Sequence, residues 1–286
     1  MHQSVMARES LEYLAVRPDG KYVDATAGLG GHTALIAQKL TTGFVIANDR
    51  DAQSLELART NTEEWADCIR YHQGAFSELA ETVKWADGGK LDGLLADLGV
   101  SRYQLTTPER GFSILADGPL DMRMDQSTGM TAADLVNHTA EKELADLIFQ
   151  LGEERRARRI ARALVRARPI RSTRHLADVV ERAVPRTGRL HPATRTFMAL
   201  RMAVNDESGE LEQLLKTAPD LLQPGGRMVV ISFMSTDDRM VKRRFRELAE
   251  QDRAKILTKR PLQPTDEEIA RNAASRSAKL RAIEMS

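Results

Sequence analysis

The chain has 286 residues, 42% hydrophobic and 29% charged, which is typical of a soluble globular protein with one large or two modest cores. Its single cysteine, Cys68, excludes an internal disulfide and a thiolate metal cluster, and the six histidines show no ligand spacing, so we predict no metal site. No apolar run approaches membrane-spanning length and the N-terminus lacks an export pattern, so we expect a cytoplasmic protein without membrane contact.

The net charge of +1 conceals a strong asymmetry along the chain. Residues 151–201 contain fourteen arginines, no lysine and four acidic residues, which gives this segment a net charge of +10. The rest of the chain is therefore acidic. Such a distribution predicts that the basic segment faces a polyanion.

The first structural signal follows a lead-in helix predicted within residues 1–20. Residues 22–33 are typical of a short buried strand, a glycine turn and the first turn of a helix. The glycines Gly28, Gly30 and Gly31 let the backbone bend sharply and let a ligand lie against main-chain N–H groups.

A second strand over residues 44–48 ends at Asp49, the position where nucleotide-binding folds hold a pair of ribose hydroxyls. The dinucleotide fingerprint requires a third glycine where this chain has Thr33, which counts against NAD and FAD. The order of strand, turn, helix, strand and acid favours S-adenosylmethionine (SAM). The alternative is an ordinary strand-to-helix turn with a solvated Asp49.

Two more strands predict a parallel sheet. One covers residues 69–72 and leads to a loop with Phe76, and the other covers residues 91–97 and ends at Asp97. Ligands bind beyond the carboxyl ends of parallel strands, so Asp97 should lie between the reactive end of the cofactor and the substrate. The alternative for Asp97 is a loop or helix cap.

The strand pattern then stops. Residues 104–206 predict helices over 131–151, 152–168, 173–180 and 192–204. Strands resume at 225–232, followed by a helix over 237–251 and two last strands at 254–258 and 278–283. We therefore predict an α/β fold with a discontinuous domain, residues 1–103 and 207–286, interrupted by an all-helical insertion, residues 104–206.

Charged side chains in the insertion are candidates for substrate binding. Asp121, Arg123 and Asp125 form an irregular charged loop that could grip a base or a phosphate, or could be a structural ion-pair loop. Residues 191–196 place Arg195 near a helix start, which is a second candidate phosphate contact.

Blocks of residues along the chain resemble the bacterial small-subunit rRNA cytosine-N(4) methyltransferase family of the RsmH/MraW type. The blocks are His2 with Ser4-Val5, then residues 24–32, 49–51, 97–101, 104, 109–113, 118–125, 152–155, 191–197, 201, 204–205, 232–233 and 235. The resemblance extends from residue 2 to about residue 245, and residues 275–277 match more loosely.

This resemblance implies a class I SAM-dependent methyltransferase: a Rossmann-like, mostly parallel seven-stranded sheet with a helical insertion that recognises rRNA. Its product would be N(4)-methylcytidine in 16S rRNA, at the decoding centre (P site) of the small ribosomal subunit. Because methylation of an amino group needs hydrogen-bond acceptors aimed at its N–H bonds, Asp97 is the candidate catalytic residue, and the backbone carbonyls of Leu98 and Gly99 are further candidate acceptors. The predicted SAM contacts are Gly28, Gly30, Gly31, His32, Asp49, Phe76, Asp97 and Gln104. The predicted substrate contacts are Asp121, Arg123, Asp125, Arg155 and Arg195.

The chain also departs from the family pattern. Met234 stands where the family usually has a histidine, and residues 236–238 and Arg102 differ as well. Two alternatives therefore remain open: a SAM-dependent methyltransferase of another substrate, and a non-catalytic SAM-binding ribosome-assembly factor. A homodimer is neither required nor excluded by the sequence.

Overall fold

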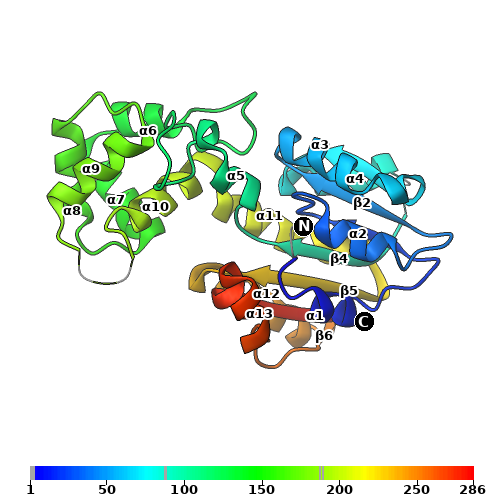
Figure 1. Cartoon of the computed structure of the whole chain (residues 1–286). Coiled ribbons are helices and arrows are strands. Elements are labelled where there is room, and N and C mark those ends of the chain that lie inside the picture. Colours follow the sequence, from blue (N-terminus) through cyan, green and yellow to red (C-terminus); the bar gives the residue numbers. More distant parts are fainter. Residues whose placement is uncertain (1–3, 87–88, 187, 189) are drawn as a thin grey trace. The chain divides into compact units, whose positions relative to one another are not determined.

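The computed structural model describes residues 4–86, 89–186, 188 and 190–286 (Figure 1). It divides into two compact units. Met1–Gly99 and Ser208–Ser286 form the sheet unit, and Val100–Glu207 form the helical unit. His2, part of the first block of the family resemblance, lies outside the described residues.

The sheet unit is built on seven strands in the order β3-β2-β1-β4-β5-β7-β6. Their bounds are β1 Lys21–Asp24, β2 Phe44–Asp49, β3 Ile69–Gln73, β4 Leu91–Asp97, β5 Leu222–Ser232, β6 Ala254–Ile256 and β7 Lys279–Met285. The first five strands pair in parallel, and β7 runs antiparallel to both β5 and β6. This is the class I methyltransferase fold, so the predicted fold class is confirmed.

Helices cover both faces of this sheet because alternate strand residues are apolar on each side. The helices of the unit are α1 Ala7–Leu14, α2 Gly31–Ala37, α3 Ala52–Asn61, α4 Leu79–Ala86, α11 Glu207–Leu221 (from Ser208 on), α12 Ser235–Glu250 and α13 Asp266–Arg271. Short 3-10 turns lie at η1 Glu63–Cys68, η2 Phe76–Glu78 and η4 Ala273–Ser277. On one face α4, α11 and α12 pack on Val23 and Val230, and on the other α1, α2 and α3 pack on Tyr22 and Val229.

Several predicted bounds in the sheet unit need correction. The strand predicted at residues 225–232 begins at Leu222, and the helix predicted from residue 237 begins at Ser235. The lead-in helix is shorter than residues 1–20, because α1 ends at Leu14 with Ala15 in the left-handed conformation. Helices α11 and α13 were not predicted from the sequence.

The helical unit has its own core. Its helices are α5 Arg102–Thr106, η3 Pro108–Arg110, α6 Ala132–His138, α7 Glu141–Gly152, α8 Ala157–Arg166, α9 Thr173–Ala183 and α10 Thr194–Asn205. Leu144, Ile148, Ile160, Leu164 and Leu200 are completely buried in this core. The unit therefore packs as a domain in its own right.

One predicted helix of this unit is wrong. The single helix expected over residues 131–151 is two helices, α6 and α7, because Thr139 and Ala140 are both extended (ψ 138° and 149°). Thr131 caps α6 as predicted and accepts a hydrogen bond from the Asp134 N–H at 3.0 Å. Similarly, the helix expected from Gly152 begins only at Ala157, since Glu153 is left-handed (φ 49°).

Within the described part of the chain, no helix is long and apolar enough to cross a membrane. The same residues bring together no group of three or more His, Cys, Asp or Glu side chains that could hold a metal ion.

Candidate active site

The glycine turn between β1 and α2 is a close-packed structure. Gly28 and Gly30 both have positive φ, 51° and 85°, so glycine is the residue that adopts this bend without strain. A Cβ on Gly30 would lie 2.7 Å from Cγ2 of Thr62, and one on Gly31 would lie 2.3 Å from Oγ of Ser4. The backbone at these positions therefore has no room for side chains.

Asp49, at the end of β2, is fixed by the same turn. Its Oδ2 accepts a hydrogen bond from the Gly28 N–H at 2.7 Å, and its Oδ1 accepts one from the Asp51 N–H at 2.8 Å. Burial raises the pKa of Asp49 to about 7, although these two hydrogen bonds act in the opposite direction. Each oxygen keeps a further lone pair, which suits a pair of ribose hydroxyls.

Asp24, at the end of β1, is completely buried and organises the beginning of α2. Its Oδ2 accepts a hydrogen bond from the Thr33 hydroxyl at 2.7 Å, and its Oδ1 accepts one from the Thr26 N–H at 3.2 Å. Burial raises the pKa of Asp24, and the nearby His32 acts against that rise. Thr33 thus binds Asp24 at the position where a dinucleotide fingerprint would need glycine.

Asp97 ends β4, which pairs directly with β1. The Asp97 N–H donates to the hydroxyl of Thr26 at 2.7 Å, which fixes the backbone. The side chain is 22% exposed, but its Oδ1 is buried and has no hydrogen-bond partner among the described residues. Its Oδ2 lies 3.6 Å from Nε2 of His32. The exposed part of this carboxylate lies at the rim, where it can accept a hydrogen bond from a ligand.

Phe76 lies in η2, after β3, and packs against the core on one face of the sheet. Glu210, from α11, holds the turn in place: its carboxylate accepts from the Ser77 N–H at 2.9 Å and from the Ser77 hydroxyl at 3.0 Å. The Ala75 N–H donates to Glu78 at 2.8 Å, so both sides of the Phe76 turn are fixed.

These residues fit SAM. The half-buried Gly28 leaves its backbone open to a ligand, Asp49 offers a carboxylate for ribose hydroxyls, and the partly exposed Asp97 offers an acceptor at the adjacent strand end. Seven of the predicted SAM contacts belong to the sheet unit and surround the ends of β1, β2, β3 and β4: Gly28, Gly30, Gly31, His32, Asp49, Phe76 and Asp97. The eighth, Gln104, belongs to the helical unit, where it is buried and its Oε1 accepts from the Ser101 N–H at 2.9 Å.

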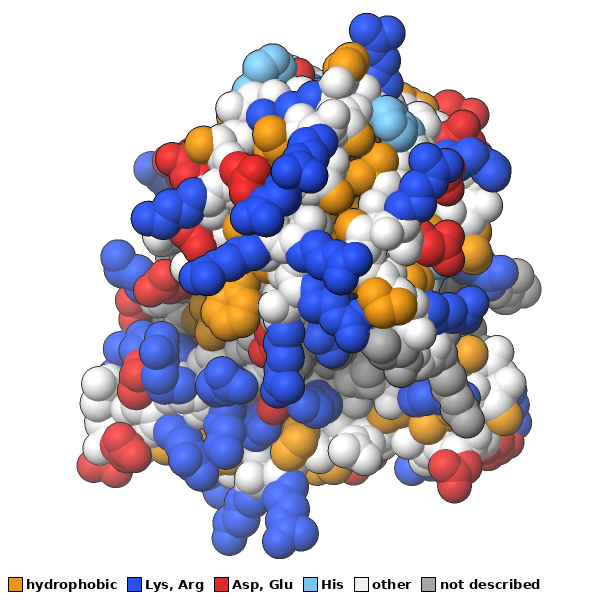
Figure 2. Space-filling model, turned by 90° about the vertical axis from the view of Figure 1, so that its left-hand side faces the viewer, with side chains coloured by type: hydrophobic (Ala, Val, Ile, Leu, Met, Phe, Trp, Pro, Cys, Tyr) orange, Lys and Arg blue, Asp and Glu red, His pale blue; other side chains and the backbone are white. Residues whose placement is uncertain are grey.

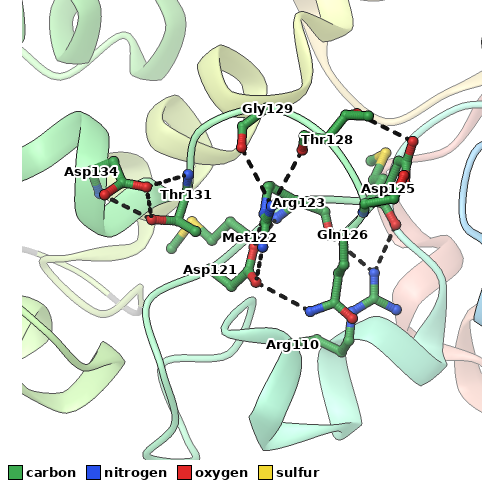
Figure 3. Close-up of polar contacts among 12 residues, drawn as sticks. Arg110, Asp121, Met122, Arg123, Asp125, Gln126, Thr128, Gly129, Thr131 and Asp134 are labelled. Atoms are coloured by element: carbon green, nitrogen blue, oxygen red, sulfur yellow. Dashed lines mark hydrogen bonds and ion pairs between the residues drawn. The ribbon is translucent and has the colours of Figure 1, made fainter.

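The charged loop of the helical unit is held together by its own contacts (Figure 3). Asp121 accepts from Nε and Nη2 of Arg123 at 2.7 and 3.0 Å, and Arg123 Nη1 donates to two loop carbonyls at 3.3 Å. Burial acts to raise the pKa of Asp121, but hydrogen bonds from Arg123 and Gln126 lower it overall. Asp125 accepts from the hydroxyl of Ser127 at 2.6 Å. These contacts support the alternative that the loop is a structural ion-pair loop. Contact of Asp121, Arg123 and Asp125 with substrate stays a prediction.

The basic segment gives the helical unit an arginine-covered surface, and Figure 2 shows Lys and Arg side chains side by side over much of one face. Four exposed residues of this segment, at and near α8, make neither an ion pair nor a side-chain hydrogen bond with any residue that the structure describes: Arg155, Arg158, Arg159 and Arg166. Arg195 is exposed as well, and its Nη1 donates to the Glu153 carbonyl at 2.9 Å. Unpaired exposed guanidinium groups are well suited to phosphate.

Met234, where the resemblance leads one to expect histidine, lies just beyond the end of β5. Its carbonyl accepts from the Asp238 N–H at 3.1 Å and its side chain is half-buried. Ile231, three residues earlier, is the β5 partner of Asp97, so the substitution falls on the same edge of the sheet.

Sequence reasoning missed the residues that support this edge. Asp24 and Thr26 were present in the glycine motif, and their place at a strand end was the signal for a role in positioning Asp97 and His32. Glu210 gave no signal, because it lies more than a hundred residues from the Phe76 turn that it holds.

Comparison with known proteins agrees with this geometry. A model of the MraW methylase family matches residues 1–286, the whole chain. The ribosomal RNA small subunit methyltransferase H of Solibacter usitatus is 72% identical over 285 residues, covering 100% of both chains. The protein of the same name from Acidobacterium capsulatum is 50% identical, covering 99% of this chain and 98% of its own. The chain therefore belongs to the MraW methylase family.

Proposed function

We propose that this protein transfers a methyl group from SAM to the exocyclic N(4) amino nitrogen of a decoding-centre cytidine in 16S rRNA. The observation that carries the proposal is the 72% identity, over the full length of both chains, to a protein named ribosomal RNA small subunit methyltransferase H. A substrate of this kind would place the protein in the cytoplasm, where small subunits are assembled.

SAM supplies a methyl group on a sulfonium, so transfer is an in-line displacement that depends mainly on positioning. The amino nitrogen of cytosine is a poor nucleophile because its lone pair is delocalised into the ring. A hydrogen-bond acceptor aimed at its N–H favours the reactive pyramidal form and then takes the proton. The partly exposed carboxylate of Asp97 is such an acceptor.

The helical unit supplies the second requirement, a surface for RNA. Its unpaired arginines at and near α8 would hold the strand through phosphates, while the target base leaves its stack at a cost of a few kcal/mol. We propose Arg155 and Arg195 as phosphate contacts and keep Asp121, Arg123 and Asp125 as candidates for contact near the target. Gln104 remains a proposed SAM contact.

The direct test is nucleoside analysis of small-subunit rRNA from cells with and without the gene, followed by restoration with the gene. Loss of N(4)-methylcytidine and its return would support the proposal, and unchanged rRNA would refute it. Incubation of the purified protein with labelled SAM and unmethylated subunits separates transfer from SAM binding without catalysis. Gel filtration with light scattering would establish whether the active form is a homodimer.

A further inference from the structure

His32 and Asp97 lie next to each other at the sheet edge, with Nε2 of His32 3.6 Å from Oδ2 of Asp97. Nε2 of His32 and the other carboxylate oxygen, Oδ1 of Asp97, are both buried and make no hydrogen bond among the described residues. His32 is 6% exposed. Leaving two such atoms unsatisfied costs stability, which points to a use in the reaction.

The proton on the His32 ring can be assigned from its surroundings. The ring also forms a hydrogen bond with the backbone of Val5, as expected when a carbonyl accepts from a ring N–H. Because Nε2 is the ring nitrogen that faces the Asp97 carboxylate, at 3.6 Å, we assign this N–H to Nδ1. In the neutral ring, Nε2 therefore presents a lone pair towards the carboxylate of Asp97, and the two groups offer one shared site for a proton.

The charges around the ring favour that proton. Burial lowers the pKa of His32, but Asp97 and then Asp24 raise it, and the net shift is upward. Asp97 comes from β4 and Asp24 from β1, so acidic groups face the ring from both strands. Together they form an Asp24–His32–Asp97 cluster, in which Asp24 and His32 are buried and Asp97 is partly exposed, at the point where the substrate amino group is expected.

We propose that His32 is the positioning residue that holds the Asp97 carboxylate and takes up, through it, the proton released by the substrate amino group. The inference rests on the proposed function and deepens it. The amino nitrogen forms a bond to the methyl carbon while the carbon–sulfur bond breaks, and the electron pair stays on sulfur. One N–H proton of the resulting ammonium group moves to the Asp97 carboxylate, where it is shared between Oδ2 and the lone pair of His32 Nε2, 3.6 Å away, and it leaves to solvent when the product departs.

The first experiment needs no substrate. Ring resonances of His32 are followed by NMR as a function of pH in the wild-type protein and in Asp97→Asn, with His72 as internal reference. We expect the His32 midpoint to fall in the variant and that of His72 to stay constant. An unchanged His32 midpoint would overturn the pairing, whether or not the protein proves to be an rRNA methyltransferase.

The second experiment uses His32→Gln, because an amide can still donate a hydrogen bond to Asp97 but cannot take up a proton. We expect kcat, measured at saturating SAM, to fall by about 10²-fold, which separates the effect on transfer from any change in SAM affinity. The wild-type kcat should rise with pH as the shared site loses its proton, and this inflection should move to lower pH in the variant. His72→Gln, in the same unit but on β3, is the matched control and should keep both kcat and profile.

These outcomes distinguish the possible failures. A wild-type protein that forms no N(4)-methylcytidine refutes the proposed function, while the NMR result stands by itself. If His32→Gln keeps the wild-type kcat and inflection, His32 plays no part in proton transfer. If it loses SAM binding with kcat unchanged, His32 is a cofactor contact only, and the proposal is also overturned.

Discussion

The carboxylate of Asp49 is hydrogen-bonded to the backbone N–H of Gly28 at 2.7 Å. This contact joins the end of β2 to the glycine turn that follows β1, so the two recognition elements of the proposed SAM site are fixed relative to each other. The turn cannot move without disturbing the acid that would hold the ribose.

The raised pKa of Asp49 predicts pH-dependent SAM binding. The ionised carboxylate accepts hydrogen bonds from both ribose hydroxyls, whereas the protonated form loses acceptor capacity. Since the pKa is about 7 in the folded protein, SAM affinity should increase between pH 6 and pH 8 and then level off. Below the pKa the change should approach about tenfold per pH unit, measured by isothermal titration calorimetry.

Asp49→Asn is the control for this dependence, because the amide of asparagine does not titrate. Any pH dependence that remains in the variant comes from other groups, such as the amino group of SAM itself. The variant should bind SAM weakly, with a shallower pH profile. Identical profiles for both proteins would show that Asp49 does not hold the ribose.

Gly30→Ala should destabilise the sheet unit and weaken SAM binding. The new Cβ would sit at φ 85° and 2.7 Å from Thr62, so strain and overlap add to a loss of about 3 kcal/mol in unfolding free energy. Gly225→Ala is the matched control, with φ 78° and no atom within 4 Å, and should cost about 1 kcal/mol. Urea unfolding measures both, and equal losses would contradict the close packing at Gly30.

Asp97→Ala should abolish methyl transfer while leaving the fold intact. The substitution removes the proposed acceptor for the amino group, a loss of at least about 10²-fold in kcat. Oδ1 makes no hydrogen bond within the described residues, so the melting temperature should change little. Transfer of labelled methyl to small subunits gives the rate, and near-normal turnover would remove Asp97 from the mechanism.

Binding to small-subunit rRNA should depend steeply on salt. Replacing Arg158, Arg159 and Arg166 of α8 by alanine should weaken binding and reduce the slope of log K against log salt by about 2, as expected for three lost phosphate contacts. Fluorescence anisotropy at several salt concentrations gives both quantities.

A triple alanine substitution at Arg239, Lys242 and Arg246 is the control. These residues are exposed on α12 of the sheet unit, and their substitution removes the same three positive charges. If both triple variants lose the same affinity and slope, the arginine surface of the helical unit has no special role in RNA binding.

The fold was predictable to the extent that local pattern decides it. The β1 strand, the glycine turn and the Asp49 and Asp97 strand ends follow from apolar runs that stop at polar residues. The α6–α7 break did not, because Leu135 and Leu144 continue an apolar stripe while Thr139 and Ala140 adopt extended conformations that only tertiary packing imposes. Helix α11 was not predicted either, because it contains Pro219, and proline within a pattern normally indicates the end of a helix.

The site was predicted as a set of strand-end residues, but its internal contacts were not. Asp24, Thr26 and His32 are close to one another in sequence, and their convergence on Asp97 depends on the pairing of β1 with β4. The binding of Ser77 by Glu210 is a contact between distant segments, which no spacing rule shows.

The insertion of the helical unit between β4 and β5 also has a consequence for biosynthesis. During translation, the outer edge of β4 emerges long before its partner β5, which follows only after the helical unit and α11 have been made. Throughout that interval the β5-facing edge of this strongly apolar strand has no partner, which makes it a target for chaperones and prone to aggregation. A helical unit that folds early would bring the two flanks together and shorten the exposure.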